Sequence, residues 1–272
     1  MSSIKNMKLY SSLDRVERDL AAAGHPSGPV PVDVLARFDQ LHYHGTDAVD
    51  HAIQAVEITA ESRVLDIGSG YGGPARWVAH QTGARVDAIE LQPDLNDFAK
   101  SLTARAGLSE KVSHIQGDIL ETPLMPEIYT AAISFLALYH IPARESLFPN
   151  VKNALKSGGY LYVEDLYRIG TPTQSEQDDL DGMMQANTLP TREIYIAELS
   201  TAGFSSICFK DMTENWAEFT AGRLADFRLN RPAYEQIHGS EVFDALEHFY
   251  LVISGLLAGG NLGGVRYTAR KL

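Results

Sequence analysis

The pattern of apolar and polar positions changes near residue 58 of the 272-residue chain. Before that point apolar residues recur at helical spacing, which predicts helices over 14–23, 32–40 and 46–56 and no strand. A segment rich in proline and glycine, residues 25–31, separates the first two helices.

From residue 63 onward, short apolar runs alternate with helical patterns. The predicted strands are 63–67, 85–91, 112–116, 129–136 and 160–164, and the predicted helices are 74–82, 95–106 and 147–155. Strands and helices that alternate at this spacing form βαβ units with right-handed crossovers. This part of the chain therefore predicts an α/β fold with a parallel sheet.

The last hundred residues follow the alternation less strictly. We predict helices over 191–202, 216–234 and 240–257, and strands over 206–212 and 265–271. The single cysteine, Cys208, is expected to be a buried residue of its strand. One cysteine alone excludes an intrachain disulfide and a cysteine-rich zinc site.

Composition narrows the classes of partner. Lys and Arg number 23 against 35 Asp and Glu, a formal net charge of −12, which argues against a nucleic-acid binder and against docking on anionic lipid. No apolar run reaches the roughly 18 residues of a membrane span, and residues 1–20 carry charges where a signal peptide needs an apolar run. We therefore expect a cytoplasmic protein. The pair His42 and His44 lacks further ligands, so no metal site is expected.

A glycine-rich loop joins the first strand to the following helix. Asp66 ends the strand, and Gly68, Ser69, Gly70 and Gly73 follow. Glycine lets the backbone turn sharply and approach a ligand closely, and the helix N-terminus adds free N–H groups. The glycine spacing also satisfies G-x-G-x-x-G, so a nicotinamide dinucleotide is one possible ligand.

Two acidic residues follow at the ends of the next two strands. Glu90 stands about 20 residues after the loop, where a carboxylate binds the hydroxyls of an adenosine ribose. Asp118 follows the third strand, where it can accept a hydrogen bond from an adenine amino group while Ile119 packs on the ring. Glu90 indicates a bound ribose, which both a nicotinamide dinucleotide and other adenosine cofactors contain. The glycine loop, Glu90 and Asp118 together favour an adenosine cofactor other than a nicotinamide dinucleotide.

Together these motifs resemble the class I S-adenosylmethionine-dependent methyltransferases. The resemblance covers about residues 46–212 and the final strand, and it includes Leu155–Lys156–Ser157–Gly158–Gly159 before the fifth strand. Within the class, the chain looks most like the phosphoethanolamine and sarcosine/dimethylglycine N-methyltransferases. That likeness rests on the doublet Gly72–Gly73, on Gly45, and on Ala137–Leu138–Tyr139–His140–Ile141.

The resemblance implies a Rossmann-like seven-stranded sheet with helices on both faces, whose last strand is antiparallel, and a helical lid. It implies one domain: an N-terminal helical cap over 1–45, a cofactor-binding core over 46–165, a lid over 166–190, and a C-terminal part over 191–272. The residues that it implies for the cofactor are Asp66, Gly68, Ser69, Gly70, Glu90, Leu91, Asp118, Ile119, Phe135 and Tyr43.

The implied reaction is methyl transfer from S-adenosylmethionine to a small molecule, with an amine nitrogen favoured over oxygen, sulfur or carbon. His140 is the expected general base, because it follows the fourth strand at the ligand-binding edge and has a pKa suited to proton transfer. Leu136 stands where the phosphoethanolamine enzymes carry an acid, and the lid residues Gln185–Ala186–Asn187 lack the cations that would hold a phosphate. These departures favour a neutral or cationic acceptor.

Two alternatives stay open at this point. An NAD-dependent dehydrogenase would share the glycine spacing, although no lysine follows Tyr139 or Tyr160 at the spacing of a catalytic Tyr-x-x-x-Lys. A module that binds the cofactor without catalysis would need neither His140 nor the acceptor side of the site. The sequence leaves the oligomeric state unknown.

Overall fold

The computed structural model describes residues 13–272. Its strands are β1 (Arg63–Ile67), β2 (Arg85–Glu90), β3 (Val112–Gln116), β4 (Tyr129–Phe135), β5 (Leu155–Arg168), β6 (Phe204–Asp211) and β7 (Leu262–Lys271). Its helices are α1 (Asp14–Ala22), α2 (Val32–Leu35), α3 (Gly45–Ala55), α4 (Gly73–Thr82), α5 (Pro93–Arg105), α6 (Arg144–Ala154), α7 (Gln174–Gly182), α8 (Arg192–Thr201), α9 (Thr213–Leu229), α10 (Arg231–His238) and α11 (Ser240–Ala258). A 3₁₀ turn spans Leu138–His140.

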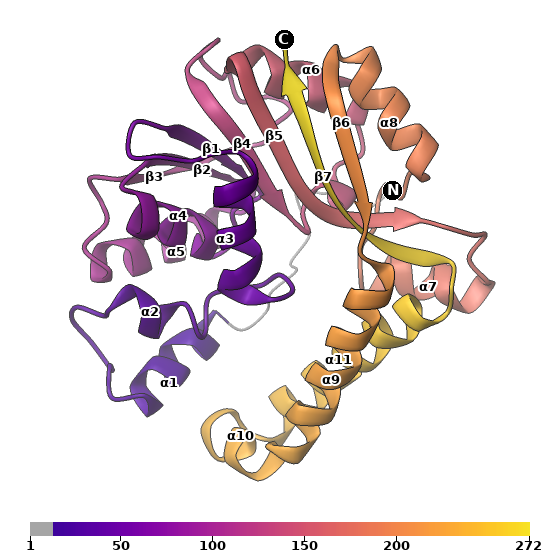
Figure 1. Ribbon diagram of the computed structural model, residues 1–272. Helices are drawn as coiled ribbons and strands as arrows, with labels where there is room; N and C mark the ends of the chain where they lie inside the picture. Colours follow the sequence, from indigo (N-terminus) through magenta and orange to yellow (C-terminus); the bar gives the residue numbers. More distant parts are fainter. Residues whose placement is uncertain (1–12) are drawn as a thin grey trace.

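All the strands join one seven-stranded sheet in the order β3-β2-β1-β4-β5-β7-β6 (Figure 1). Strands β1 to β5 are parallel, and β7 runs antiparallel between β5 and β6. The predicted sheet and its inserted last strand are therefore confirmed. A dinucleotide-binding sheet would have six strands in the order 3-2-1-4-5-6, which the antiparallel β7 rules out.

Helices cover both faces of the sheet. On one face, α3 and α4 bury small apolar residues such as Val49 and Val78 against β1, β2 and β4. On the other face, α6 and α8 bury larger residues such as Phe148 and Tyr195 against β4, β5 and β7. Because both faces are covered, β4 is buried along almost its whole length, as its apolar sequence predicts.

The second helix is shorter than predicted. The pattern over 32–40 predicts a helix, but α2 ends at Leu35 and the chain continues in turns. The irregular path brings Asp39 to Arg76 of α4, with Oδ2 and Nη2 2.8 Å apart. Arg76 is fully buried and donates further hydrogen bonds to Tyr71 O, Ala99 O and Thr103 Oγ1. A buried guanidinium needs a carboxylate partner, and Asp39 in this irregular segment supplies it.

The helices between β6 and β7 form an arm that extends away from the sheet (Figure 1). The pattern predicts one helix over 216–234, but α9 ends at Leu229 and α10 starts at Arg231. Pro232 explains the break, because proline lacks an N–H and is tolerated only in the first turn of a helix. The tip of the arm returns to the N-terminal cap, where His238 Nε2 donates to Asp19 Oδ1 at 2.6 Å.

Residues 166–190, predicted as a lid, differ from the predicted structure in two respects. β5 is longer than predicted, from Leu155 to Arg168, so the first residues of that segment lie in the sheet. The segment also contains α7, which the apolar pattern missed. Thr173 and Glu176 form a capping box at its start, and this T-x-x-E signal is visible in the sequence. The division of the chain into cap, core and lid stays a prediction, and residues 1–12 of the cap lie outside the described residues.

Cys208 is exposed, so the prediction that it is buried was wrong. It does lie in a strand, β6, but β6 is the edge of the sheet. The pairing of β6 with β7 also shifts register between Ser205 and Cys208. An edge strand with interrupted pairing has less cover than the central strands, and this leaves the thiol in contact with solvent.

Residues 13–272 lack two features that would indicate other classes of protein. None of the helices there combines the length and apolar character needed to cross a bilayer. No group of three or more His, Cys, Asp or Glu side chains in that range is arranged to hold a metal ion.

We expect Arg76→Met to lower the free energy of unfolding by about 3–5 kcal/mol, because it leaves the buried Asp39 carboxylate without its cationic partner. Urea unfolding measures this loss. Arg85→Met is the matched control, because Arg85 is exposed, and its effect should stay within about 0.5 kcal/mol. A loss as small as that control's for Arg76→Met would contradict the buried-pair account.

Candidate active site

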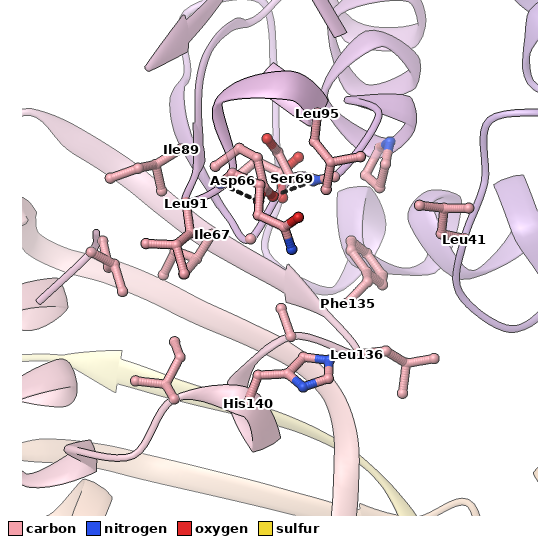
Figure 2. A pocket seen from close by; sticks show the side chains of 18 of the residues that line it. Leu41, Asp66, Ile67, Ser69, Ile89, Leu91, Leu95, Phe135, Leu136 and His140 are labelled. Atoms are coloured by element: carbon pink, nitrogen blue, oxygen red, sulfur yellow. Dashed lines mark hydrogen bonds between the residues drawn. The ribbon is translucent and has the colours of Figure 1, made fainter. Parts of the chain in front are cut away.

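A cavity with about 1040 Å³ of empty space, part of it open to solvent, lies at the carboxyl edge of β1, β2, β3 and β4. Its lining comes from the loops that follow these four strands and from residues 39–42 of the N-terminal cap. Parallel α/β sheets bind ligands at this edge. In Figure 2, Asp66 and Ser69 lie at the glycine loop and His140 lies across the opening from them.

The glycine loop packs so closely against the loop after β4 that a side chain would not fit at Gly68. Gly68 has a φ of 70°, and a Cβ at this position would stand 2.4 Å from the Cβ of Ala137. Gly73 begins α4, and a Cβ there would stand 2.5 Å from Asp39 O. Pro74 follows in the first turn, so the helix starts with N–H groups that have no partner within the helix.

The carboxylate of Glu90 is held by backbone N–H groups. Its Oε2 accepts from Gly70 N at 2.8 Å and its Oε1 accepts from Gln92 N at 3.0 Å. Glu90 is buried, and burial raises the pKa of its carboxyl group, while the hydrogen bond from Gln92 opposes the rise. A carboxylate has about four acceptor positions, so each oxygen can accept another hydrogen bond.

Asp66 and Ser69 provide polar atoms without partners. Asp66 Oδ2 and Ser69 Oγ are buried and have no hydrogen-bond partner, although both residues line the cavity. Burial and, to a lesser extent, the nearby carboxylate of Glu90 together raise the pKa of Asp66 to about 7. Buried polar atoms that lack partners inside a cavity indicate a place for a polar ligand.

The loop after β3 contains Asp118 and Ile119, the two residues predicted to contact the adenine. Asp118 and Ile119 both line the cavity, and Asp118 Oδ1 accepts from Leu120 N at 2.9 Å. Gly117 N donates to Glu90 O at 2.9 Å, which ties this loop to the end of β2. The sheet therefore brings Asp66, Glu90 and Asp118 to three neighbouring strand ends.

The opposite side of the cavity is apolar around one histidine. Phe135, Leu136, Ala137, Ile141 and Pro142 line it together with His140. Leu136 has a φ of 52°, a conformation that a non-glycine residue rarely adopts, and its N–H donates to Glu164 O at 2.7 Å. Such strain is concentrated at functional sites.

The contacts of His140 define its tautomer. Its Nδ1 lies 3.0 Å from Gln185 O, and a carbonyl can only accept, so Nδ1 carries the proton and Nε2 carries the lone pair. Burial lowers the pKa of His140 to about 4, although the Gln185 carbonyl opposes this. The imidazole is therefore neutral at pH 7 and can accept a proton at Nε2.

Tyr43, which the resemblance assigns to the cofactor, lies outside the cavity lining. It is buried, and its ring packs edge-on against Trp216, with 4.9 Å between centroids. Leu91 and Phe135, which the resemblance also assigns to the cofactor, do line the cavity. The lid segment 166–190 contributes no lining residue. It packs instead behind the His140 turn, where Asn187 donates to His140 O.

Sequence reasoning missed the contribution of the cap loop. Asp39, Leu41 and His42 line the cavity, and the His42 ring lies 4.6 Å from that of Phe135. Burial lowers the pKa of His42 to about 4, so this residue is neutral as well. No local pattern marks Leu41, because the path of this loop depends on contacts between distant segments, such as that of Asp39 with Arg76.

The charged side chains that line the cavity are all acidic. Among the described residues that line it are four carboxylates, those of Asp39, Asp66, Glu90 and Asp118, and neither lysine nor arginine. The residues fit the adenosine and amino-acid parts of S-adenosylmethionine on three grounds. The Gly68 loop leaves room for backbone approach, Glu90 keeps open acceptor positions, and Asp66 and Ser69 have atoms without partners.

The comparisons with known proteins agree with this fold. A family model described as "Methyltransferase domain" matches residues 65–163. Methyltransferase GfsG of Streptomyces halstedii is 25% identical over 226 residues, which cover 79% of this chain and 81% of that protein. The sarcosine/dimethylglycine N-methyltransferase of Halorhodospira halochloris is 27% identical over 158 residues, covering 58% of this chain and 56% of that enzyme.

A solved structure is similar along nearly the whole chain. It is phosphoethanolamine N-methyltransferase 2 of Haemonchus contortus in complex with S-adenosyl-L-methionine. The TM-score is 0.81 at 19% identity, and the match covers 97% of this chain and 60% of that one. This likeness shows the fold.

The sheet and the loops at its carboxyl edge are thus those of a methyltransferase. Residues 65–163 form a methyltransferase domain, and the chain is an S-adenosylmethionine-dependent methyltransferase. The dehydrogenase alternative is overturned by this match and by the strand order.

We expect Glu90→Ala to weaken binding of S-adenosylhomocysteine by about 1–3 kcal/mol, because buried hydroxyl groups would lose a charged hydrogen-bond partner. Titration calorimetry measures this change. Asp97→Ala is the control, since that side chain is 74% exposed on α5. If Glu90→Ala binds S-adenosylhomocysteine as tightly as Asp97→Ala does, Glu90 does not contact the cofactor and only stabilises the glycine loop.

We expect Asp66→Asn to stabilise the ligand-free protein at pH 8 but not at pH 4. The raised pKa means that the folded state keeps a proton that the unfolded state releases, so the native Asp66 costs stability increasingly from about pH 4 to pH 7. Melting temperatures at the two pH values test this sign. An equal gain at both would show that ionisation of Asp66 is not the cause.

Proposed function

We propose that this chain transfers the methyl group of S-adenosylmethionine to an amine nitrogen of a small molecule, and that His140 accepts the proton which the acceptor loses. The observation that carries the proposal is the orientation of His140. Its Nδ1 is bound to the Gln185 carbonyl, and the ring lines the cavity opposite Asp66 and Ser69. The likeness to a sarcosine/dimethylglycine N-methyltransferase supports nitrogen as the acceptor atom.

We assign cofactor contacts to the residues of the glycine loop and of the neighbouring strand ends. They are Asp66, Gly68, Ser69, Gly70, Glu90, Leu91, Asp118, Ile119 and Phe135. Glu90 would accept from the ribose hydroxyls and Asp118 from the adenine amino group, with Leu91 and Ile119 beside the adenine ring. When bound, S-adenosylmethionine supplies a methyl group that its sulfonium has already activated.

Because the methyl group is activated by the cofactor, the protein has mainly to orient the acceptor and exclude water. Well-oriented reactants gain up to about 7–11 kcal/mol over free ones. Leu136, Ile141 and Pro142 around His140 supply a dry surface for this. The neutral His140 accepts a proton as positive charge develops on the attacking atom.

A hydroxyl oxygen is the second candidate, and the apolar surroundings of His140 favour it. An ammonium group would need an anion beside it, because an unpaired charge is costly to bury. The carboxylates of the cavity belong instead to the cap loop and to the strand ends of β1, β2 and β3. An acceptor at His140 therefore enters uncharged, as a free amine or as an alcohol.

We expect His140→Gln to lower kcat by about 10²–10⁴-fold while cofactor affinity stays within twofold, because only proton transfer is lost. A panel of amines and alcohols, with S-adenosylhomocysteine release as the readout, first identifies an acceptor. For the native protein, kcat/KM should be constant between about pH 6 and pH 8 and should fall toward pH 4, as His140 becomes protonated.

The exposed His80 offers a matched control, and His80→Gln should behave as the native protein. A His140→Gln variant that keeps the native rate would remove the histidine from the mechanism. Methylation of alcohols alone would replace nitrogen by oxygen as the acceptor atom.

A further inference from the structure

Asp165 is a charged residue in the middle of the sheet, and its side chain is fully buried. It belongs to β5, which pairs with β4 on one side and with β7 on the other. The hydroxyl of Tyr195 in α8 donates a hydrogen bond to Asp165 Oδ2. Burial raises the pKa of the Asp165 carboxyl group to about 6, although the nearby guanidinium of Arg144 opposes the rise. At pH 8 the group is therefore ionised, in a place where an isolated charge would be costly.

The cation beside this carboxylate is Arg144, the first residue of α6. Its Cζ lies 4.1 Å from the centre of the Tyr195 ring, and its Nε donates to Glu198 Oε2 at 2.9 Å. Asp165, Arg144 and Tyr195 thus form a buried network, here called the Asp165 network, that joins β5, α6 and α8. A buried ion pair is weak evidence for stability, because apolar residues of similar volume often pack as well. The contacts of the network indicate a different role.

The Asp165 network contacts the 3₁₀ turn over residues 138–140, which carries His140. The backbone N–H of Tyr139 faces the Asp165 carboxylate and stabilises its ionised form. Arg144 Nη1 makes a long contact of 3.5 Å with Leu138 O. The network therefore contacts the backbone of the two residues that precede His140.

A second segment, residues 185–188, holds the other polar groups of the turn. Thr188 N donates to Tyr139 O at 3.0 Å, and Asn187 Nδ2 donates to His140 O at 2.8 Å. The His140 ring itself donates to Gln185 O. Because a 3₁₀ turn of three residues has few hydrogen bonds of its own, its position depends on such outside contacts.

We propose that Asp165 is a positioning residue for His140: together with Arg144 and Tyr195, it fixes the turn so that Nε2 of the imidazole faces the acceptor. Asp165 is not among the described residues that line the cavity, so it acts through the turn and does not touch the acceptor. Displacing a reacting group by about 1 Å can cost about 10²-fold in rate. The proposal rests on the proposed function in taking His140 as the base.

The first test is a double-mutant cycle on the full chain at pH 8, with the acceptor that the panel identifies and S-adenosylhomocysteine release as the readout. Asp165→Asn keeps the shape of the side chain but removes its charge. We expect it to lower kcat at least about tenfold, while S-adenosylhomocysteine affinity stays within about twofold. In a His140→Gln background it should change kcat by less than about twofold, because the residue that Asp165 positions is already absent.

The second test needs no turnover. NMR of protein with ¹⁵N-labelled histidine rings reports which nitrogen of each imidazole carries the proton, and the His140→Gln spectrum identifies the signals of His140. We expect the native ring to carry its proton at Nδ1. Asp165→Asn should give a mixture of Nδ1–H and Nε2–H tautomers, because a displaced ring loses the Gln185 carbonyl.

Two further variants serve as controls. Asp211→Asn changes a similar pair, in which the Tyr167 hydroxyl donates to Asp211 Oδ2 at 2.9 Å at the end of β6. It should leave kcat and the His140 signals unchanged. Tyr195→Phe keeps the ring under Arg144 but removes the hydrogen bond to Asp165, so it should reproduce the effects of Asp165→Asn in weaker form. If Asp165→Asn does not fold, Tyr195→Phe decides both tests.

The outcomes separate this proposal from the proposed function. If His140→Gln is slower than the native protein, the cycle decides. A native kcat in Asp165→Asn, or a loss by the same factor in both backgrounds, would then overturn the proposal. If His140→Gln keeps the native rate, or the panel finds no acceptor, the proposed function fails by itself and the NMR test decides. A mixture of tautomers in Asp165→Asn would still support the positioning of the ring, and an unchanged Nδ1–H tautomer would refute it.

Discussion

The buried guanidinium of Arg76 is the constraint on which the site depends. This one side chain bonds to Asp39 of the cap, to the carbonyl of Tyr71 in the glycine loop, and to Ala99 and Thr103 of α5. A cation with no contact to water keeps all of these partners, because losing any of them leaves an uncompensated charge or donor. The glycine loop and the cap are therefore held together before any ligand is bound.

This connection explains why the cavity has two different sides. The side formed by the strand ends of β1, β2 and β3 has carboxylates and backbone N–H groups, which suits adenosine and an amino acid. The side around Leu136 and His140 is apolar and has one neutral base.

Most of the sheet could be predicted, because strands buried on both faces appear as continuous apolar runs between glycine turns. The positions of Asp66, Glu90 and Asp118 could be predicted as well, since successive parallel strands end at one edge of the sheet. Two errors had signals in the sequence: Pro232 breaks the long helix of the arm, and Thr173 with Glu176 starts the missed helix α7. The exposure of Cys208 had no signal in the sequence, because an edge strand has the same local pattern as a central strand.

Local sequence was enough for the class of fold, the glycine loop, the strand-end acids and the position of His140, because each depends on residues close together in the chain. The tautomer of His140, the position of Tyr43 and the approach of Leu41 and His42 to the cavity came only from the folded structure. Each depends on a contact between distant segments, such as His140 with Gln185 or Arg76 with Asp39. The packing of whole elements selects such contacts, and no local pattern records them.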